Sequence, residues 1–531
     1  MSKDTAPVTK SGAVERFERR DWLAAAMLFA ASLAIRIPFR SHFAYHWDSA
    51  QFSLAIEHYD VSLGLPHLPG YFLYVMFGRI VNLLVGDPHA SLVWMSVLAG
   101  AALAGLGYLL AAALFGRDCG LAAGCLLAAS PLCWFQSEVA LTTIVDSALV
   151  VATVLICWKA IGSGGGWPWV IAMAVMLTLV AGVRQQTTPV LCPVWVYTFW
   201  KFPRPRWRKF VVGLLVAGLL CTAWFIPMVH MSGGLGMYLR LYPERVRKDA
   251  PLTPLGGGPE NLINSAAMIV GSCWVGLLGA GLLAGAESLL WLTRKDGKWA
   301  TLVNRGEELR FLAMWIVPMV VFGLVYTIIP GYTLCYFPGI AILAAWATCR
   351  LVTRIDHAFP QQRPYGLVTV IAGISLINSA VFLLPARETT WLRANLPLTA
   401  AEIRRHDRQL GQWFQAIRER FRPDEVMICH DNQAFFYGFR LFQYHLPEYE
   451  NWLLTTDTAL RPPFNQKLWR ARNHQVEFMD RFEPRGHTTL ILVVSPGGNV
   501  DEFAPVLDVR KAKKWEIPDS APLYTLTVGA E

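Results

Sequence analysis

The chain has 531 residues, of which 54% are hydrophobic and only 16% are charged, and its mean hydropathy is +0.37. A soluble globular protein carries about a quarter charged residues, so this composition excludes an ordinary soluble enzyme and indicates a polytopic membrane protein. The formal net charge of +9 does not indicate nucleic-acid binding, because most lysines and arginines lie in loops beside apolar segments. The ten cysteines show no disulfide framework or zinc pattern.

About eleven apolar segments have roughly the length that a helix needs to cross a bilayer, which is about 20 residues. They lie at 21–38, 91–115, 119–135, 143–160, 168–183, 188–200, 208–229, 261–291, 310–328, 332–349 and 364–384. The polar, basic stretch 1–20 is expected to be a cytoplasmic tail, because no small-residue cleavage site follows the first apolar segment. The sequence therefore predicts an α-helical transmembrane module over residues 21–385.

Basic loops predict the orientation of these segments, because short cytoplasmic loops are rich in lysine and arginine. The loops that we expect in the cytoplasm are 201–210, 293–310 and 349–364. Counting spans from them places the loops 39–90 and 230–260, and everything after 384, on the external face. The apolar piece 71–87 cannot cross an odd number of times under this count, so we predict an interfacial helix on the outer face.

Residues 395–531 are predicted to form a small extracytoplasmic α/β domain. A capping box from Thr399 to Glu402 begins an amphipathic helix. Short strand-like segments follow, with one helix-like stretch between the first two, and this alternation is typical of an α/β fold. The segments are EVMICHD, YENWLLTT, TTLILVVS and PLYTLTV. No glycine fingerprint for nucleotide binding is present, so no chemistry is assigned to this domain.

The first external loop carries two candidate site residues. Asp48 lies in YHWDSAQF between Trp47 and Phe52, which suggests a partly dry environment. A carboxylate there can take a proton from a hydroxyl group or hold a metal ion, although a solvated loop acid or a helix cap would explain it equally well. His67 lies beside two prolines and a glycine, so its imidazole either enters a site or only occupies a turn.

Two further carboxylates lie in WFQSEVALTTIVDSALV, Glu138 in an external turn and Asp146 one or two turns into the next span. Acids inside a membrane are functional by default, but Asp146 could instead bond a neighbouring helix, and Glu138 could be a solvated turn acid. Arg184 ends a span at VRQQTTP, where it could hold phosphate oxygens or extend to the interface.

The external loop 230–260 is basic, against the positive-inside rule, and its best candidates for binding are Arg247 and Lys248. Anionic lipid headgroups or a bound phosphate would explain cations on this side of the membrane. A solvated basic helix is the alternative.

The combination of these motifs resembles the C-type superfamily of integral-membrane glycosyltransferases, in the branch with protein O-mannosyltransferases and the lipid A aminoarabinose transferase. The resemblance covers about residues 1–385. It rests on HWDSAQF, PHLPGYFLYV, LFGRDCGLAAGCLLAASPLCWFQSEVALTTIVDSAL and PGYTLCYFPGIAIL. Where the family usually has a second proline this chain has Leu68, and Gly331 stands where the family often has arginine.

The resemblance implies a polyprenyl-phosphate or pyrophosphate sugar donor, and transfer on the exoplasmic face by an inverting single displacement. It matches Asp48 to the catalytic base, Glu138 or Asp146 to the second acidic position, and His67 to the substrate pocket. It also places Arg184 beside the lipid phosphate. Some superfamily members use a divalent metal and others do not, so metal dependence stays open. The acceptor, whether glycan, lipid or protein, is not assigned.

Two other classes of function fit the same sequence. A transporter or flippase of a lipid-linked or anionic substrate would use intramembrane acids and cations as a translocation path. A non-catalytic membrane scaffold would use the tail to bind partners. Against transport, the polar residues collect on one face and the two halves show no repeat. The expected location is a bacterial inner membrane, with the C-terminal domain outside and no nucleic-acid partner.

Overall fold

A computed structural model describes most of the chain. The described residues are 17–293, 305–326, 329–358, 366–384, 398–430, 438–454, 478–479, 486–494, 499–518 and 520–528. The predicted domain boundary near residues 385–395 and most of the predicted cytoplasmic tail lie outside them.

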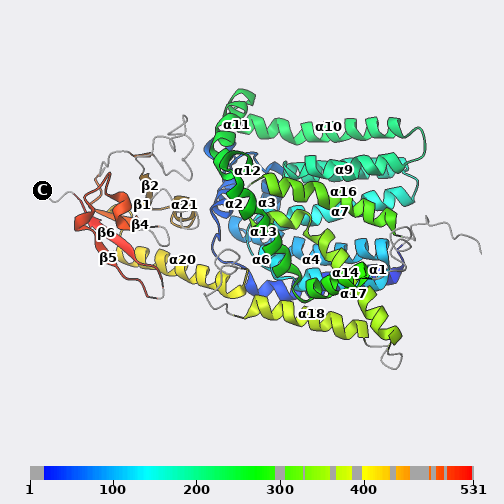
Figure 1. The fold of residues 1–531 in the computed structure, drawn as a ribbon. Helices are drawn as coiled ribbons and strands as arrows, with labels where there is room; N and C mark the ends of the chain where they lie inside the picture. Colours follow the sequence, from blue (N-terminus) through cyan, green and yellow to red (C-terminus); the bar gives the residue numbers. More distant parts are fainter. Residues whose placement is uncertain are drawn as a thin grey trace, which may run out of the picture.

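Long apolar helices form the larger part of the molecule (Figure 1). Seven helices in the described part are long and apolar enough to cross a membrane, and two bent pairs raise the number to nine. The seven are α1 (Arg19–Arg36), α4 (Pro88–Phe115), α7 (Thr142–Gly162), α10 (Arg206–Met231), α16 (Gly306–Val325), α17 (Phe337–Ala358) and α18 (Gly366–Leu383). The protein is therefore an integral membrane protein, as its composition predicts.

The bent pairs account for two predicted spans. α5 (Arg117–Ala129) and α6 (Pro131–Ser137) meet at 55°, where proline lacks the N–H that would continue the helix. α13 (Pro259–Leu277) and α14 (Gly279–Thr293) meet at 103°.

The remaining two predicted spans are short helices. α8 (Trp167–Val183) has 17 residues and α9 (Thr187–Lys201) has 15. Since neither reaches the length of a full span, the predicted number of eleven transmembrane helices is not confirmed.

The loop predicted to be the first external loop folds into short helices at one end of the bundle. These are η1 (Ile37–Phe39), α2 (Trp47–Glu57), η2 (Val61–Leu63) and α3 (Phe72–Val85). The helix expected over 71–87 is present as α3, whose 14 residues are too few to cross a bilayer. α3 buries Tyr74 and Val75 completely and leaves Leu83 and Leu84 85% and 90% exposed. The exposed leucines could contact lipid, which suits the interfacial position that we predict for α3.

Three short elements cover the same end of the bundle further along the chain. They are α11 (Leu235–Asp249), η3 (Ala250–Leu252) and α12 (Pro254–Gly257).

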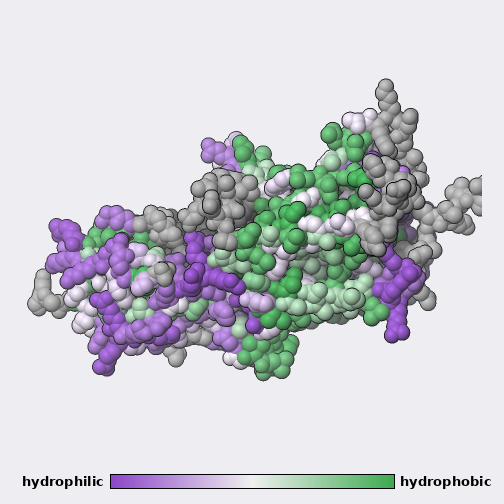
Figure 2. All heavy atoms as spheres, turned by 90° about the horizontal axis from the view of Figure 1, so that it is seen from below, coloured by the Kyte–Doolittle hydropathy of each residue, from purple (hydrophilic) through white to green (hydrophobic). Residues whose placement is uncertain are grey.

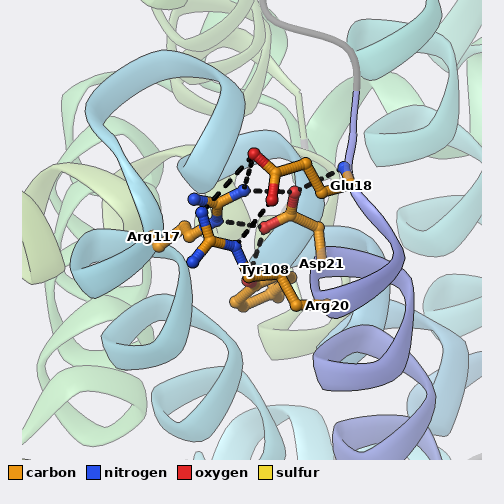
Figure 3. Close-up of polar contacts among 5 residues, drawn as sticks. All are labelled: Glu18, Arg20, Asp21, Tyr108 and Arg117. Carbon is orange, nitrogen blue, oxygen red and sulfur yellow. Dashed lines mark hydrogen bonds and ion pairs between the residues drawn. The ribbon is translucent and has the colours of Figure 1, made fainter.

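At the opposite end of the bundle, a cluster of charged residues at the start of α1 links this helix to its neighbours (Figure 3). Arg117 donates to both carboxylate oxygens of Asp21, at 2.6 and 3.0 Å, and lies 3.1 Å from a carboxylate oxygen of Glu18. The hydroxyl of Tyr108 donates to Asp21 at 3.2 Å. A paired arginine and carboxylate form strong hydrogen bonds, so the cluster fixes α1 against α4 and α5.

The C-terminal region forms a six-stranded mixed sheet with helices (Figure 1). The elements are α20 (Ala400–Arg420), β1 (Val426–His430), α21 (Phe439–His445), β2 (Glu450–Leu454), β3 (Phe478–Met479), β4 (Thr489–Val493), η7 (Val500–Phe503), η8 (Val509–Lys511), β5 (Lys513–Trp515) and β6 (Leu523–Thr527). The strand order is β3-β2-β1-β4-β6-β5, in which β3, β2, β1 and β4 run parallel. β6 and β5 complete the sheet in antiparallel pairs.

The four predicted strand segments are confirmed as β1, β2, β4 and β6. The side chain of Thr399 accepts the N–H of Glu402 at 3.3 Å, as expected for the start of the amphipathic helix. Strands β3 and β5 are additional to the prediction.

Hydrophobic residues predominate over the helical part of the face in Figure 2, hydrophilic residues predominate over the C-terminal sheet, and a smaller hydrophilic group lies at the opposite end of the bundle. An apolar zone between two hydrophilic ends is the surface that a bilayer requires. The C-terminal sheet lies at the end of the bundle that carries α2 and α11 (Figure 1).

Candidate active site

Asp48 lies in the first turn of α2. The helix begins after His46, whose ring nitrogen Nδ1 accepts the N–H of Asp48 at 3.1 Å. One carboxylate oxygen of Asp48 lies 3.5 Å from Nδ1 of His67, and the other lies 3.7 Å from Nδ1 of His46. A helix N-terminus stabilises a negative charge, and the Asp48 side chain is 23% exposed. The carboxylate is therefore flanked by two imidazoles and remains accessible.

His67 is held beside Asp48 by its own contacts. Its Nδ1 lies 2.7 Å from the side-chain oxygen of Gln51. An amide oxygen can only accept, so Nδ1 carries the proton of this hydrogen bond. The imidazole ring lies 5.1 Å from the ring of Tyr71 and 6.0 Å from the ring of Phe52. These contacts place His67 next to Asp48 and suit the predicted position in a substrate pocket.

Arg184 and Asp146 form a second group of site residues. Arg184 caps the C-terminal end of α8, is only 5% exposed, and holds its guanidinium 3.9 Å from the ring centre of Tyr332. Asp146 is fully buried in α7 and accepts a hydrogen bond from the hydroxyl of Thr187 at 2.8 Å. The charges of Arg184 and Asp146 are close enough to interact. Each therefore offsets part of the cost of burying the other.

Tyr71 connects the two groups. Its hydroxyl accepts a hydrogen bond from the amide of Gln186 at 3.4 Å. It is also close enough to Asp48 and Arg184 to interact electrostatically with both. Arg184 in turn lines a small open hollow between α9, α16 and η4 (Pro330–Cys335).

The hollow is lined mainly by apolar and aromatic side chains, among them Phe322, Tyr326, Tyr332 and Tyr336. These residues and Tyr71 are not among the site residues predicted from the sequence. The signal that could have found Tyr332 is the late motif PGYTLCYFPGIAIL, in which it is the first tyrosine.

Glu138 lies apart from these groups. It is fully buried at the end of α6, and its charge interacts with that of Arg36, which is fully buried at the end of α1. Arg36 also donates to the hydroxyl and the carbonyl of Ser32 and lies 5.9 Å from the ring centre of Trp134. Glu138 is thus buried between α1 and α6, near the opposite charge of Arg36.

Arg247 and Lys248 lie near the end of α11, and their side chains are outside the described part of the structure. The helix itself contacts the loop 39–90, because the hydroxyl of Tyr238 donates to the carbonyl of Pro69 at 3.1 Å. The described residues contain no group of three His, Cys, Asp or Glu side chains placed to hold a metal ion.

Comparisons with known proteins agree with this architecture. Residues 69–230 match the family model described as dolichyl-phosphate-mannose-protein mannosyltransferase. ArnT from Cupriavidus metallidurans bound to undecaprenyl phosphate aligns over 97% of this chain and 99% of its own, with a TM-score of 0.57 and 12% identity. The chain has the fold of a C-type integral-membrane glycosyltransferase. The resemblance expected from the motifs is confirmed.

Other matches add to the comparison. The apo structure of the same ArnT covers 96% of this chain and 97% of its own, with a TM-score of 0.53 and 13% identity. No curated protein sequence matches the chain. The matched family region includes Tyr71, Glu138, Asp146 and Arg184, whereas Asp48 precedes it.

Proposed function

We propose that this protein is a glycosyltransferase that moves a sugar from a polyprenyl-phosphate or pyrophosphate donor to an acceptor on the exoplasmic face of a bacterial inner membrane. The observation that carries the proposal is the meeting of two groups at Tyr71. An accessible carboxylate, Asp48, lies on one side, and a buried cation beside an aromatic hollow, Arg184, lies on the other. The family match and the ArnT bound to undecaprenyl phosphate support a lipid phosphate as the ligand.

In the proposed reaction, Arg184 binds the donor phosphate. A guanidinium donates paired hydrogen bonds to phosphate oxygens and stabilises the charge that grows on them as the bond to the sugar breaks. The apolar lining contributed by Phe322 and Val190 suits the isoprenoid carbons nearest the phosphate. The lipid phosphate leaves with the electron pair of the broken bond.

Asp48 is the proposed general base. It removes the proton of the acceptor hydroxyl while the acceptor oxygen forms its bond to the anomeric carbon from the opposite face. Nδ1 of His46 accepts the backbone N–H of Asp48, His67 lies 3.5 Å from the carboxylate, and the exposure of the carboxylate gives the acceptor access. A single displacement of this kind inverts the configuration of the sugar.

Asp146 is the more suitable second acid. Its charge interacts with Arg184, and its hydrogen bond from Thr187 holds it one turn into α7. We propose that Asp146 orients Arg184 toward the phosphate. The charge of Glu138 interacts with that of Arg36 instead, so we assign Glu138 to the contact between α1 and α6.

Replacement of Asp48 by asparagine tests this proposal. Asn keeps the size of the side chain but cannot take a proton, and a general base contributes about 10²–10⁴-fold to a rate. Turnover should fall by that factor, measured by mass spectrometry of lipid-linked sugars and envelope glycoconjugates in cells with and without the variant.

The matched control is Glu57→Gln, at the other end of α2, which should transfer sugar at the wild-type rate. Near wild-type transfer by Asp48→Asn, in protein that is inserted normally, would make Asp48 a helix-cap acid and remove the proposed base.

A further inference from the structure

The C-terminal domain holds the backbone of the segment that leads from α1 to α2. The N–H groups of His42 and Phe43 both donate to the carboxylate of Asp407, at 2.8 and 3.1 Å. The N–H of Ala44 donates to Nε2 of His445 at 3.1 Å. Three consecutive backbone N–H groups of the first external loop therefore bind side chains of α20 and α21.

The carbonyl of Ala44 is bound as well. It accepts a hydrogen bond from Nε2 of His406 at 3.2 Å. Burial lowers the pKa of His406 to about 4, so its ring is neutral near pH 7 and donates through Nε2–H. We call Asp407, His406 and His445 the 42–44 clamp.

Two of the three clamp residues are buried, and their hydrogen-bonding groups bind the segment that they hold. Asp407 and His406 are only 9% and 4% exposed, and a buried carboxylate is costly unless its oxygens accept hydrogen bonds. Both described hydrogen bonds to the Asp407 carboxylate come from the segment it holds. The ring of Phe43 adds an apolar contact, at 5.0 Å from the ring of His445.

The same domain also contacts the helix that carries Asp48. The ring of Phe439 in α21 packs edge-on against Trp47 with the ring centres 4.8 Å apart. Arg440 donates to the carbonyl of Leu63 at 2.7 Å, between α2 and α3. α21 therefore touches the first turn of α2 and the loop that follows it.

We infer that the 42–44 clamp positions the proposed base, so that the C-terminal domain is part of the active site although it supplies no reacting group. The inference rests on the proposed function of Asp48. The clamp ends at Ala44, only four residues before Asp48, and α2 begins between them. A shift at residue 44 moves the start of α2, and a misplacement of about 1 Å can reduce a rate about 10²-fold.

Asp407→Asn tests the positioning role in the full-length protein. The side chain of Asn has one oxygen, which can accept from one of the two backbone N–H groups. Its NH₂ group then faces the second N–H and cannot accept from it. A lost hydrogen bond to a charged group corresponds to about tenfold to a hundredfold. We expect kcat for transfer to fall by this factor while KM for the donor stays unchanged. In combination with Asp48→Asn, the Asp407 change should cause no further loss, because it acts through Asp48.

Two further variants separate positioning from folding. His445→Ala removes the acceptor for Ala44 and should lower kcat, whereas His445→Gln supplies an amide oxygen and should restore most of it. Asp508→Asn is the control, because it removes an exposed ion pair with Arg510 in the same domain and should change nothing. Equal kcat in wild type and both clamp variants, or losses that add fully to that of Asp48→Asn, would overturn the positioning role.

Hydrogen exchange provides a measurement that does not depend on activity. In Asp407→Asn the amides of residues 42–48 should exchange faster, while those of β1 and β4 should exchange at the wild-type rate. Unchanged exchange at 42–48 would overturn the clamp itself. Faster exchange combined with no sugar transfer by the wild-type protein would instead contradict the proposed function.

Discussion

Removing the charge of Arg184 should have two effects that can be separated. Arg184 is 5% exposed and Asp146 is fully buried, and their charges interact. Removing one of two interacting buried charges destabilises a protein, because the other charge loses its compensation. Arg184→Gln should therefore lower stability, although the hydrogen bond from Thr187 to Asp146 remains. Any loss of activity in this single variant would mix misfolding with loss of the phosphate site.

The double variant Arg184→Gln with Asp146→Asn removes both charges together. Replacing a buried pair by neutral groups is often tolerated, so this protein should regain most of its stability. It still lacks the cation for the donor phosphate. One missing hydrogen bond to a charged group costs about 1.5–3 kcal/mol, so kcat/KM for the donor should stay about tenfold to a hundredfold below wild type.

Thermal unfolding in detergent, with and without polyprenyl phosphate, measures both effects. A ligand present at about 100 times its Kd stabilises the folded protein by about 2.7 kcal/mol, so wild-type protein should melt at a higher temperature when the lipid is present. The double variant should show a smaller increase. Arg422→Gln, an exposed arginine of the C-terminal domain, should behave as wild type. A double variant that folds and is stabilised as strongly as wild type would refute phosphate binding by Arg184.

Three shorter predictions follow from other parts of the structure. A cysteine placed at the exposed position His58 should be labelled from outside the cell by a reagent that cannot cross the membrane, whereas a cysteine at Asp118 should be labelled only after permeabilisation. Labelling of position 118 from outside, with position 58 protected, would contradict the predicted orientation of the helices in the membrane. Arg117→Gln breaks the cluster of Figure 3 and should lower the melting temperature without changing the donor KM; an unchanged melting temperature would show that the cluster is not stabilising. Burial raises the pKa of Asp407 from 3.8 to about 6, although the N–H bonds from His42 and Phe43 act in the opposite direction. Between these two pH values the native state therefore binds more protons than the unfolded state. The free energy of unfolding should fall by about 3 kcal/mol as the pH rises through this range. Asp407→Asn should flatten this dependence in unfolding measured against pH, and parallel curves for the two proteins would contradict it.

The sequence predicted the helices better than their breaks. Every predicted apolar segment corresponds to a helix or a bent pair, because the length and hydropathy that a membrane requires leave a strong signal. The run 261–291 was read as one span, yet it turns by 103° beside Leu278, which has a φ of 40°. Composition alone does not reveal such a turn, because apolar residues are required on both sides of it.

The candidate site was predicted in part for a similar reason. Counting spans predicts one face for Asp48, His67 and Arg184, and the structure places these residues around Tyr71 or in direct contact with it. Counting does not reveal which way a helix is rotated. The pairing of Glu138 with Arg36 depends on that rotation, so the sequence could not distinguish Glu138 from Asp146 as the partner of the cation.

The clamp also affects how the protein is made. Its hydrogen bonds join residues that lie 362 to 401 positions apart in the chain. Residues 42–44 are synthesised with the first helix, whereas their partners follow all the membrane helices and fold last, since domains generally fold as units in the order of synthesis. A chain that stops before α20 would keep its lipid-facing helices but leave these backbone groups without the side chains that bind them. The end of the protein that carries the proposed base is thus completed only after the C-terminal domain has been synthesised and has folded.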